Sequence, residues 1–304
     1  MAITSLRVGF FTAPLVLHVA EQLGRFADAQ LAIDQTAVVS SPAQFTSLEA
    51  GEFDVVFTSP DNVLAYRFLP DNPLGRLLDV TILAGVDRGL GLSLWTRPEL
   101  NDVGELRDQV VAVDVPQSGF AFVAFALLER AGLTPGNYRV ESLGSTPRRA
   151  KALVEGACAA TILNAGNELW AEGRGCHFVG AAPDLGPYLG TVLAAMPTDD
   201  AAQRRARERF VEVILATSRD LVTGALDEVA LEVASRTLGL DDDASRAHLA
   251  VLRNADNGLI PDGSLSRAAL TTLVTLRRQF RDHEQLDLVE RSLDDLSTPD
   301  RFVA

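Results

Sequence analysis

Small polar residues recur in this sequence at points where an apolar run gives way to a helical stretch. One set lies in the first quarter of the chain: Thr12, Ser40, Ser41, Thr58, Ser59 and Asn62. A second set follows further along: Gln117, Ser118, Gly119, Ser145, Thr146 and Asn164. Hydroxyl and amide groups beside helix amino ends, where backbone N–H groups are free, suit an anionic or hydrogen-bonding ligand. We therefore predict that both sets bind a ligand, although several of these hydroxyls also suit plain helix capping.

Aromatic and basic residues near the same points widen the predicted ligand chemistry. Phe10, Phe11 and Phe120 predict an apolar or stacking wall, with burial in the core as the alternative. Arg88 is the candidate for pairing with an acidic group of the ligand, with an ordinary solvated arginine as the alternative. The ligand predicted from these residues is small, organic, and anionic or aromatic.

Residues suited to acid–base catalysis are few. Of the four histidines, only His18 stands close to one of the predicted ligand-binding loops, so it is the candidate general base. Asp61 stands in the first turn of a predicted helix, where a carboxylate also favours the helix dipole. We assign His18 and Asp61 catalytic roles only if the protein is an enzyme.

Chemistry that depends on a metal or cofactor has little support in the sequence. Lys151 is the only lysine, so any lysine Schiff base would have to use it. Cys158 and Cys176 are the only cysteines, too few for a four-cysteine zinc site. They either form one disulfide or remain unpaired thiols. We expect no metal and no cofactor.

Two stretches that carry these polar residues repeat one another. Ser41-Pro42 begins SPAQFTSLEAGEFDVVFTS, and Thr146-Pro147 begins TPRRAKALVEGACAATILN, an offset of 105 residues. In both, a Leu and then a Gly follow the Pro at the same spacing. Ser or Thr before Pro is typical of the N-cap and first residue of a helix, and Gly of a helix end. Each copy thus predicts a helix followed by a short buried strand.

The offset extends upstream, where it pairs predicted elements in the order strand, helix, strand: residues 6–11 with 110–115, 14–23 with 119–130, and 31–39 with 138–143. Strands alternating with helices predict mostly parallel sheets covered on both faces. Two copies predict an α/β protein with two lobes. Ligands bind beyond the carboxyl ends of such strands, so we expect the site in a cleft between the lobes. The pattern then becomes helical: residues 201–223, 227–238, 244–252 and 267–281.

Composition excludes several classes of partner. The chain has 304 residues and a formal net charge of −14, which argues against nucleic acid and against an anionic membrane surface. No apolar run reaches the roughly 20 residues of a membrane span. The start lacks a secretory signal as written. We therefore expect a cytoplasmic protein as the sequence stands, or an extracytoplasmic one if a signal was removed.

The sequence resembles the type II periplasmic binding proteins, in the group that serves importers of nitrate, taurine, aliphatic sulfonates and thiamine pyrimidine precursors. Five stretches in order carry this resemblance: RVGFFTAPLVLHVAEQLGRF, SLEAGEFDVVFTSPDNVLAYR, GFAFVAFALLERAGL, LGSTPRRAKALVEGACAATILN and DNGLIPDGSLSRAALTTLVTLRRQF. The resemblance implies chain crossings near residues 92–96 and 190–194. Lobe one would comprise residues 1–93 and 192–304, including the C-terminal helices, and lobe two residues 94–191. Binding would close the lobes about a hinge.

The resemblance leaves two functions open. It implies a solute-binding protein, with an ABC permease as partner if the chain is exported. The same fold hosts decarboxylases, dehydratases and a pyrimidine synthase, so the alternative is a cytoplasmic, cofactor-independent enzyme of the lyase type acting on a small organic acid. The pyrimidine synthases carry a cysteine-rich segment and a lysine that holds pyridoxal phosphate. The dispersed Cys158 and Cys176 do not fit that pattern.

Overall fold

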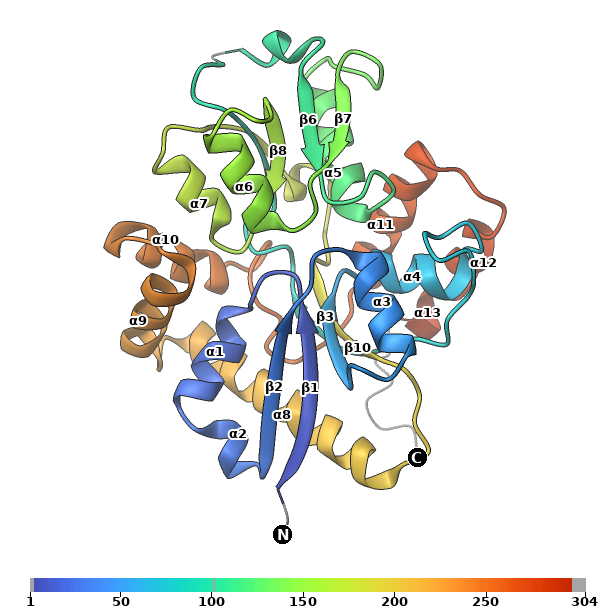
Figure 1. Ribbon diagram of the computed structural model, residues 1–304, viewed down its shortest axis with the longest axis vertical. Coiled ribbons are helices and arrows are strands. Elements are labelled where there is room, and N and C mark those ends of the chain that lie inside the picture. The colour runs from blue at the N-terminus through green and yellow to red at the C-terminus, as the bar shows by residue number, and fades with distance from the viewer. Residues whose placement is uncertain (1–2, 101, 297–304) are drawn as a thin grey trace.

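The computed structural model describes residues 3–100 and 102–296 and contains two five-stranded sheets, one in each lobe (Figure 1). The strand order of the first sheet is β2-β1-β3-β10-β4. Its strands are β1 (Thr4–Phe10), β2 (Leu31–Ala37), β3 (Val55–Thr58), β4 (Thr81–Asp87) and β10 (Thr191–Ala195). β1 pairs in parallel with β2 and β3, whereas β10 runs antiparallel between β3 and β4.

The second sheet repeats this plan, with strand order β7-β6-β8-β5-β9. Its strands are β5 (Ser93–Thr96), β6 (Val110–Val113), β7 (Arg139–Ser142), β8 (Ala160–Leu163) and β9 (His177–Ala181). β6 pairs in parallel with β7 and β8, and β5 runs antiparallel between β8 and β9. Each sheet is thus mostly parallel, with one antiparallel strand inserted as the chain passes between lobes. This is the two-lobe α/β architecture predicted from the repeat.

Helices cover both sheets and continue beyond them. Those of the first lobe are α1 (Leu15–Gln22), α2 (Arg25–Asp28), α3 (Ser41–Glu49) and α4 (Pro60–Phe68). Those of the second are η1 (Val103–Leu106), α5 (Gly119–Arg130), α6 (Thr146–Val154), α7 (Asn167–Glu172) and η2 (Ala182–Leu185). The C-terminal helices are α8 (Ala201–Thr223), α9 (Asp227–Leu238), α10 (Asp242–Arg253), α11 (Arg267–Phe280), α12 (Leu286–Arg291) and α13 (Leu293–Leu296).

The 105-residue offset holds at the level of individual elements. Helix α3 and helix α6 begin and end at matched positions, as do strands β3 and β8. The predicted helix starts are wrong by one residue, because Ser40 and Ser145 occupy the N-cap positions, and Pro42 and Pro147 are the second helical residues. A proline fits there because the N–H groups of the first helical turn have no partner within the helix.

The apolar core joins the two lobes on one side of the molecule. One continuous cluster of buried side chains includes Leu64 on α4, Phe122 on α5 and Leu273 on α11. Helix α11 therefore packs against elements of both lobes (Figure 1). A second cluster lies under α1, α8 and α9. The lobe boundaries at residues 93 and 191 stay a prediction, and residues 1–2 and 297–304 of lobe one lie outside the described residues.

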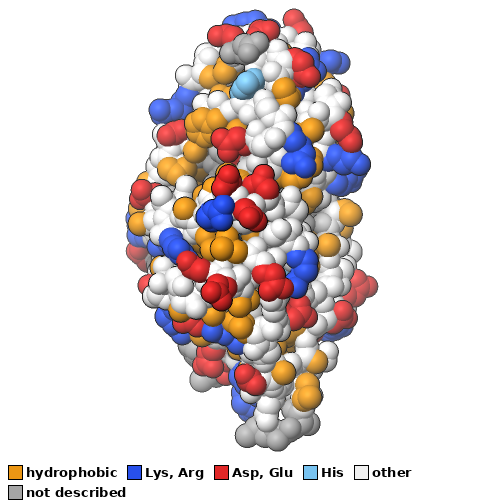
Figure 2. Space-filling view, turned by 90° about the vertical axis from the view of Figure 1, so that its left-hand side faces the viewer, with side chains coloured by type: hydrophobic (Ala, Val, Ile, Leu, Met, Phe, Trp, Pro, Cys, Tyr) orange, Lys and Arg blue, Asp and Glu red, His pale blue; other side chains and the backbone are white. Residues whose placement is uncertain are grey.

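The surface carries both signs of charge. Acidic and basic side chains alternate over the face shown in Figure 2, with small apolar areas between them. Within the described residues, no helix is both long and apolar enough to span a bilayer. Neither observation singles out a functional face on the surface.

Candidate ligand-binding cleft

A cavity of about 80 Å³ lies between the two sheets. Most of the predicted ligand-binding residues line it. From the first lobe these are Phe11, Thr12, Ser40, Ser41, Thr58, Ser59 and Asn62. From the second lobe they are Ser118, Gly119, Phe120, Ser145, Thr146 and Asn164. The loops after the parallel strands and the amino ends of α3, α4, α5 and α6 therefore converge on one space.

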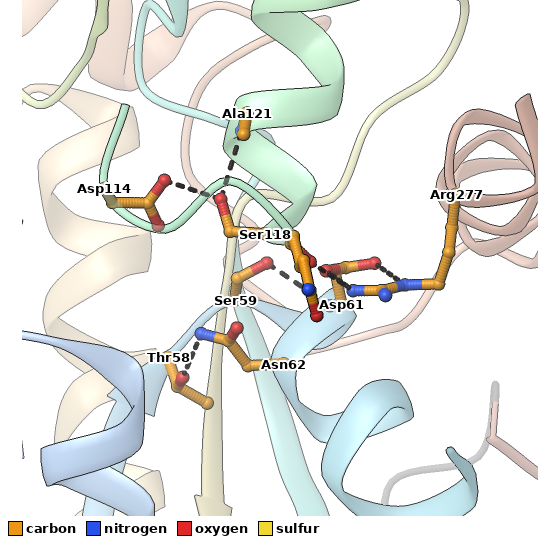
Figure 3. Close-up of polar contacts among 9 residues, drawn as sticks. Thr58, Ser59, Asp61, Asn62, Asp114, Ser118, Ala121 and Arg277 are labelled. Carbon is orange, nitrogen blue, oxygen red and sulfur yellow. Dashed lines mark hydrogen bonds and ion pairs between the residues drawn. The ribbon is translucent and has the colours of Figure 1, made fainter. Parts of the chain in front are cut away.

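Hydrogen bonds fix the polar groups on two facing walls of this cavity (Figure 3). Ser59 Oγ accepts the Asp61 N–H (3.2 Å) at the start of α4, and Asn62 Nδ2 donates to Thr58 Oγ1 (3.2 Å). On the other lobe, Ser118 Oγ accepts the Ala121 N–H (3.1 Å) at the start of α5. The Ser118 hydroxyl also donates to the Asp114 carboxylate (2.5 Å). These capping roles orient the hydroxyls without removing them from the cavity wall.

The lobe-two floor is a connected polar network. Thr146 Oγ1 accepts a bond from Arg149 Nη2 (3.2 Å) and donates to Asn164 Oδ1 (3.4 Å). Asn164 Nδ2 in turn donates to the Gly89 carbonyl oxygen (3.2 Å). Gly89 lies in the segment between β4 and β5 that joins the lobes, so the floor of the cleft is tied to this connection.

Three charged residues of the lining were not predicted from the sequence: Asp87, Asp114 and Arg149. Asp87 and Asp114 lie at or just after the ends of β4 and β6, so the rule that ligands lie beyond strand ends points to both. Burial raises the pKa of Asp87 to about 6, and hydrogen bonds from Thr191 and from the Gly89 N–H partly offset this. Among the described residues, no three His, Cys, Asp or Glu side chains form a group that could hold a metal ion.

The two lobes touch beside the cavity. A Cβ atom built on Gly119 would lie 2.7 Å from the Asp61 Cβ, so only glycine allows α5 to approach α4 this closely. A Cβ on Gly144, whose φ is +76°, would lie 2.8 Å from the Val39 carbonyl oxygen. Loops of opposite lobes therefore meet at both places.

No protein-family model and no curated protein sequence matches the chain. Solved structures do match it. The alkanesulfonate-binding protein SsuA from Xanthomonas axonopodis pv. citri, bound to MOPS, is 15% identical over 94% of this chain and 96% of its own, with a TM-score of 0.72. The nitrate-binding protein NrtA from Synechocystis PCC 6803 is 12% identical over 98% and 87%, with a TM-score of 0.75. The desulfurization enzyme DSZB is 14% identical over 98% and 97%, with a TM-score of 0.62.

The chain has the periplasmic-binding-protein fold. Identities this low establish the architecture and not the ligand. The periplasmic-binding-protein fold also occurs in a protein named as an enzyme, so the fold alone does not decide between binding and catalysis.

Three predicted ligand-binding residues lie outside the lining of the cleft. Phe10 is buried in the core of the first lobe. Arg88 Nη1 donates to the Leu259 carbonyl oxygen (2.7 Å), which fastens the end of β4 to the C-terminal segment. The Gln117 carbonyl oxygen accepts a hydrogen bond from Arg277 Nη2 (3.0 Å). In this periplasmic-binding-protein fold the three residues serve packing and contacts between segments.

The two catalytic candidates also lie outside the lining. His18 is half-buried on α1, where burial lowers its pKa, Glu21 raises it and Arg236 lowers it. Asp61 is buried and forms an ion pair with Arg277, whose Nε and Nη2 donate to the two carboxylate oxygens (2.9 and 2.5 Å; Figure 3). Asp61 therefore helps to hold α4 against α11.

Proposed function

We propose that the protein is a solute-binding protein that captures a small organic ligand, anionic or aromatic, by closing its two lobes about a hinge. The observation that carries this proposal is a cavity lined from both lobes by strand ends and by the amino ends of four helices. A ligand held by both lobes stabilises the closed arrangement over the open one, because only the closed arrangement offers all of its contacts.

The lining also supports the ligand class. Free N–H groups at helix amino ends favour an anion. Phe11 and Phe120 provide an apolar wall for an aromatic or aliphatic body. The structural neighbours named as alkanesulfonate-binding and nitrate-binding proteins take small anions by their names, which supports the same choice. In an import system, a protein of this kind delivers its ligand to an ABC permease, which is the partner that this role calls for.

Thermal denaturation and small-angle X-ray scattering test the proposal. The probes are MOPS, nitrate, benzoate and benzamide, together with any small molecule released when the purified protein is denatured. We expect at least one of them to raise Tm and to lower the radius of gyration. The proposed function is wrong if none of them does either.

A matched pair of variants locates the site. In Gly119→Ala the added Cβ collides with Asp61 and holds the lobes apart, so the ligand-induced rise in Tm should disappear. Gly173→Ala is the control, because a Cβ there makes only ordinary contacts (3.5 Å) at the end of α7, away from the cavity. If the ligand raised Tm equally in both variants, it would bind outside this cleft.

An enzyme on the same fold is the second candidate, and Asp87 is the observation that favours it. This carboxyl lines the cavity with a pKa near 6, within the range useful for proton transfer at neutral pH. If the protein is an enzyme, Asp87→Asn should abolish turnover of a bound acid and preserve the ligand-induced rise in Tm. Full turnover in Asp87→Asn would remove this residue from the reaction.

A further inference from the structure

Arg149 is a buried arginine in the lining of the cleft. It lies near the amino end of α6 and is 1% exposed. Nη1 donates to the Gly144 carbonyl oxygen, and Nη2 donates to Thr146 Oγ1 (3.2 Å) and to the Ile162 carbonyl oxygen (3.0 Å). These bonds hold the guanidinium against the 144–146 turn, which itself faces the cavity. Within the described lining, Arg149 is the one residue with a cationic side chain.

Within residues 3–100 and 102–296, the charge of Arg149 has no counter-charge at contact distance. Its three hydrogen-bond partners are neutral oxygens, and no carboxylate in the described part of the chain lies within the 4.0 Å of an ion pair. The Nε atom is buried and makes no hydrogen bond. The buried Arg277, by contrast, is paired with Asp61. An arginine side chain stays protonated inside proteins, so Arg149 cannot avoid the cost of its unpaired buried charge by losing a proton.

The positive charge of Arg149 is compensated mainly by the Asp114 carboxylate, which is not in contact with it. Burial lowers the pKa of Arg149, and the charge of Asp114 raises it by a smaller amount. Asp114 lies on the neighbouring loop and accepts its short hydrogen bond from Ser118 instead. A buried charge is best stabilised by an opposite charge in direct contact. The cavity is the side from which such a partner can arrive.

The amino end of α6 offers a place for that partner. Ser145 occupies the N-cap position, and its side chain makes no capping hydrogen bond. The first N–H groups of this nine-residue helix have no partner within the helix, as at any helix start. Across the cavity, Thr12 Oγ1 is buried without a hydrogen-bond partner. Donors from both lobes thus line the same cavity as Arg149.

We propose that the ligand carries an acidic group, such as a carboxylate, sulfonate or phosphate, that binds at the amino end of α6 and is the missing counter-ion of Arg149. This inference rests on the proposed function and narrows it, because a neutral aromatic ligand would leave the charge uncompensated. Arg149 is then the residue that selects acids. Its hydrogen bonds to Gly144 and Thr146 hold residues 144–146 in the conformation that would bind the acidic group.

Wild-type protein tests the charge requirement without any variant. Tm and calorimetric Kd are measured for matched pairs of probes that differ in charge: benzoate and benzamide, and methanesulfonate and methanesulfonamide. We expect the acid of a pair to bind and its amide to bind at least about 30-fold more weakly, as for the loss of one partner of a buried charge pair. An amide that binds as well as its acid overturns the inference but leaves the proposed function standing. If no probe binds at all, acidic or neutral, both are overturned.

Variants assign the effect to Arg149. Arg149→Gln should remove the preference for the acid, and Arg149→Lys should retain part of it, because the charge remains and the planar fork is lost. Lys151→Gln is the control, since it removes one positive charge from the exposed side of the same helix. Circular dichroism checks folding, and the lysine variant carries the test if the glutamine variant does not fold. An acid preference that survives in either folded variant at wild-type strength overturns the inference.

Discussion

Asp61 and Arg277 are 216 residues apart in the chain, and their side chains form a buried two-bond ion pair beside the cleft. Arg277 also donates to the Gln117 carbonyl oxygen on the second lobe, and its guanidinium lies 5.0 Å from the centre of the Phe122 ring. One side chain of α11 therefore contacts both lobes. This pair joins the C-terminal helices to the contact between α4 and α5.

Breaking this ion pair should destabilise the whole protein. Arg277→Met leaves the buried Asp61 carboxylate without its partner, and we expect the free energy of unfolding to fall by about 3–5 kcal/mol. Arg278→Gln on the same helix is the control, because Arg278 pairs with Asp287 and Glu290 at the surface and should cost less than about 1 kcal/mol. Urea denaturation measures both. Equal losses would mean that the Asp61 pair contributes no more than a surface pair.

Stability should fall as the pH rises toward 8 because of Glu168. Burial raises the pKa of this carboxyl to about 8, so the folded protein keeps a proton that the unfolded chain releases above its ordinary pKa of 4.5. Unfolding then becomes easier between about pH 4.5 and 8, by up to about 1.4 kcal/mol per pH unit. Glu168→Gln should flatten this dependence and raise Tm at pH 8.

The glutamine side chain in Glu168→Gln is close in shape to the protonated Glu168 carboxyl group. Its amide oxygen can accept the Gly166 N–H, as Glu168 Oε2 does (2.9 Å). Glu155→Gln, at an exposed position, is the control and should leave the pH profile unchanged. Burial lowers the pKa of His248 to about 4 and raises that of Asp87 to about 6, so both residues affect stability below about pH 6.5. The two profiles are therefore compared between pH 6.5 and 8, where the Glu168 effect stands apart from theirs. Parallel profiles for wild type and Glu168→Gln would contradict the prediction.

The two cysteines should react slowly in the native state. Cys158 and Cys176 are free and buried, so of the two interpretations of the sequence the structure has unpaired thiols. Burial raises the pKa of Cys158 to about 12 and that of Cys176 to about 11, and the thiolate is the reactive form. At pH 8 an Ellman assay should find two thiols after denaturation and little reaction before it. A rapid native reaction would show that these sites open.

The segment just before β10 should not tolerate a side chain at Gly190. A Cβ there would lie 2.4 Å from Asp87 Oδ1 and from the Gly89 backbone, neither of which can move freely. We expect Gly190→Ala to lower the free energy of unfolding by about 1–3 kcal/mol, the usual range for overpacking. It should also weaken ligand binding, because Gly190 and Asp87 both line the cavity. Chemical denaturation and calorimetry measure the two effects, with Gly173→Ala as the control. A neutral result would show that the two crossing segments are free to separate.

The sequence predicts the fold and most of the cavity lining because both depend on local patterns. The repeat that begins at Ser41 and at Thr146 predicts a helix and a strand in each lobe. Because the carboxyl ends of parallel strands lie at one edge of a sheet, the residues that follow these strands are expected to line the cavity. Arg149 was missed although a signal for it exists. Thr146, Arg149, Ala150 and Leu153 are spaced as one helix face, and all four are buried. That spacing separates Arg149 from the exposed Arg148.

Other features depend on contacts that no local pattern encodes. Asp61 was a catalytic candidate because its place in the helix is visible in the sequence, whereas its partner lies on a distant helix. Arg88 was expected at the ligand because it stands near a crossing. Its guanidinium bonds to Leu259, a residue that only the tertiary fold brings there. The direction of the Arg88 side chain therefore depends on the C-terminal segment that packs over the end of β4, which the local sequence does not reveal.

The second lobe can complete its sheet before the first lobe does, although the first lobe begins the chain. The reason is that strand β10 of the first sheet follows the whole second sheet in the sequence. β5 to β9 are continuous in the chain, so the second sheet has all its strands once residue 181 has been synthesised. The first sheet needs β10 between β3 and β4, so residues 4–87 cannot complete it alone. During synthesis, the N-terminal segment must therefore wait, with β3 and β4 unjoined, until the nested lobe has emerged.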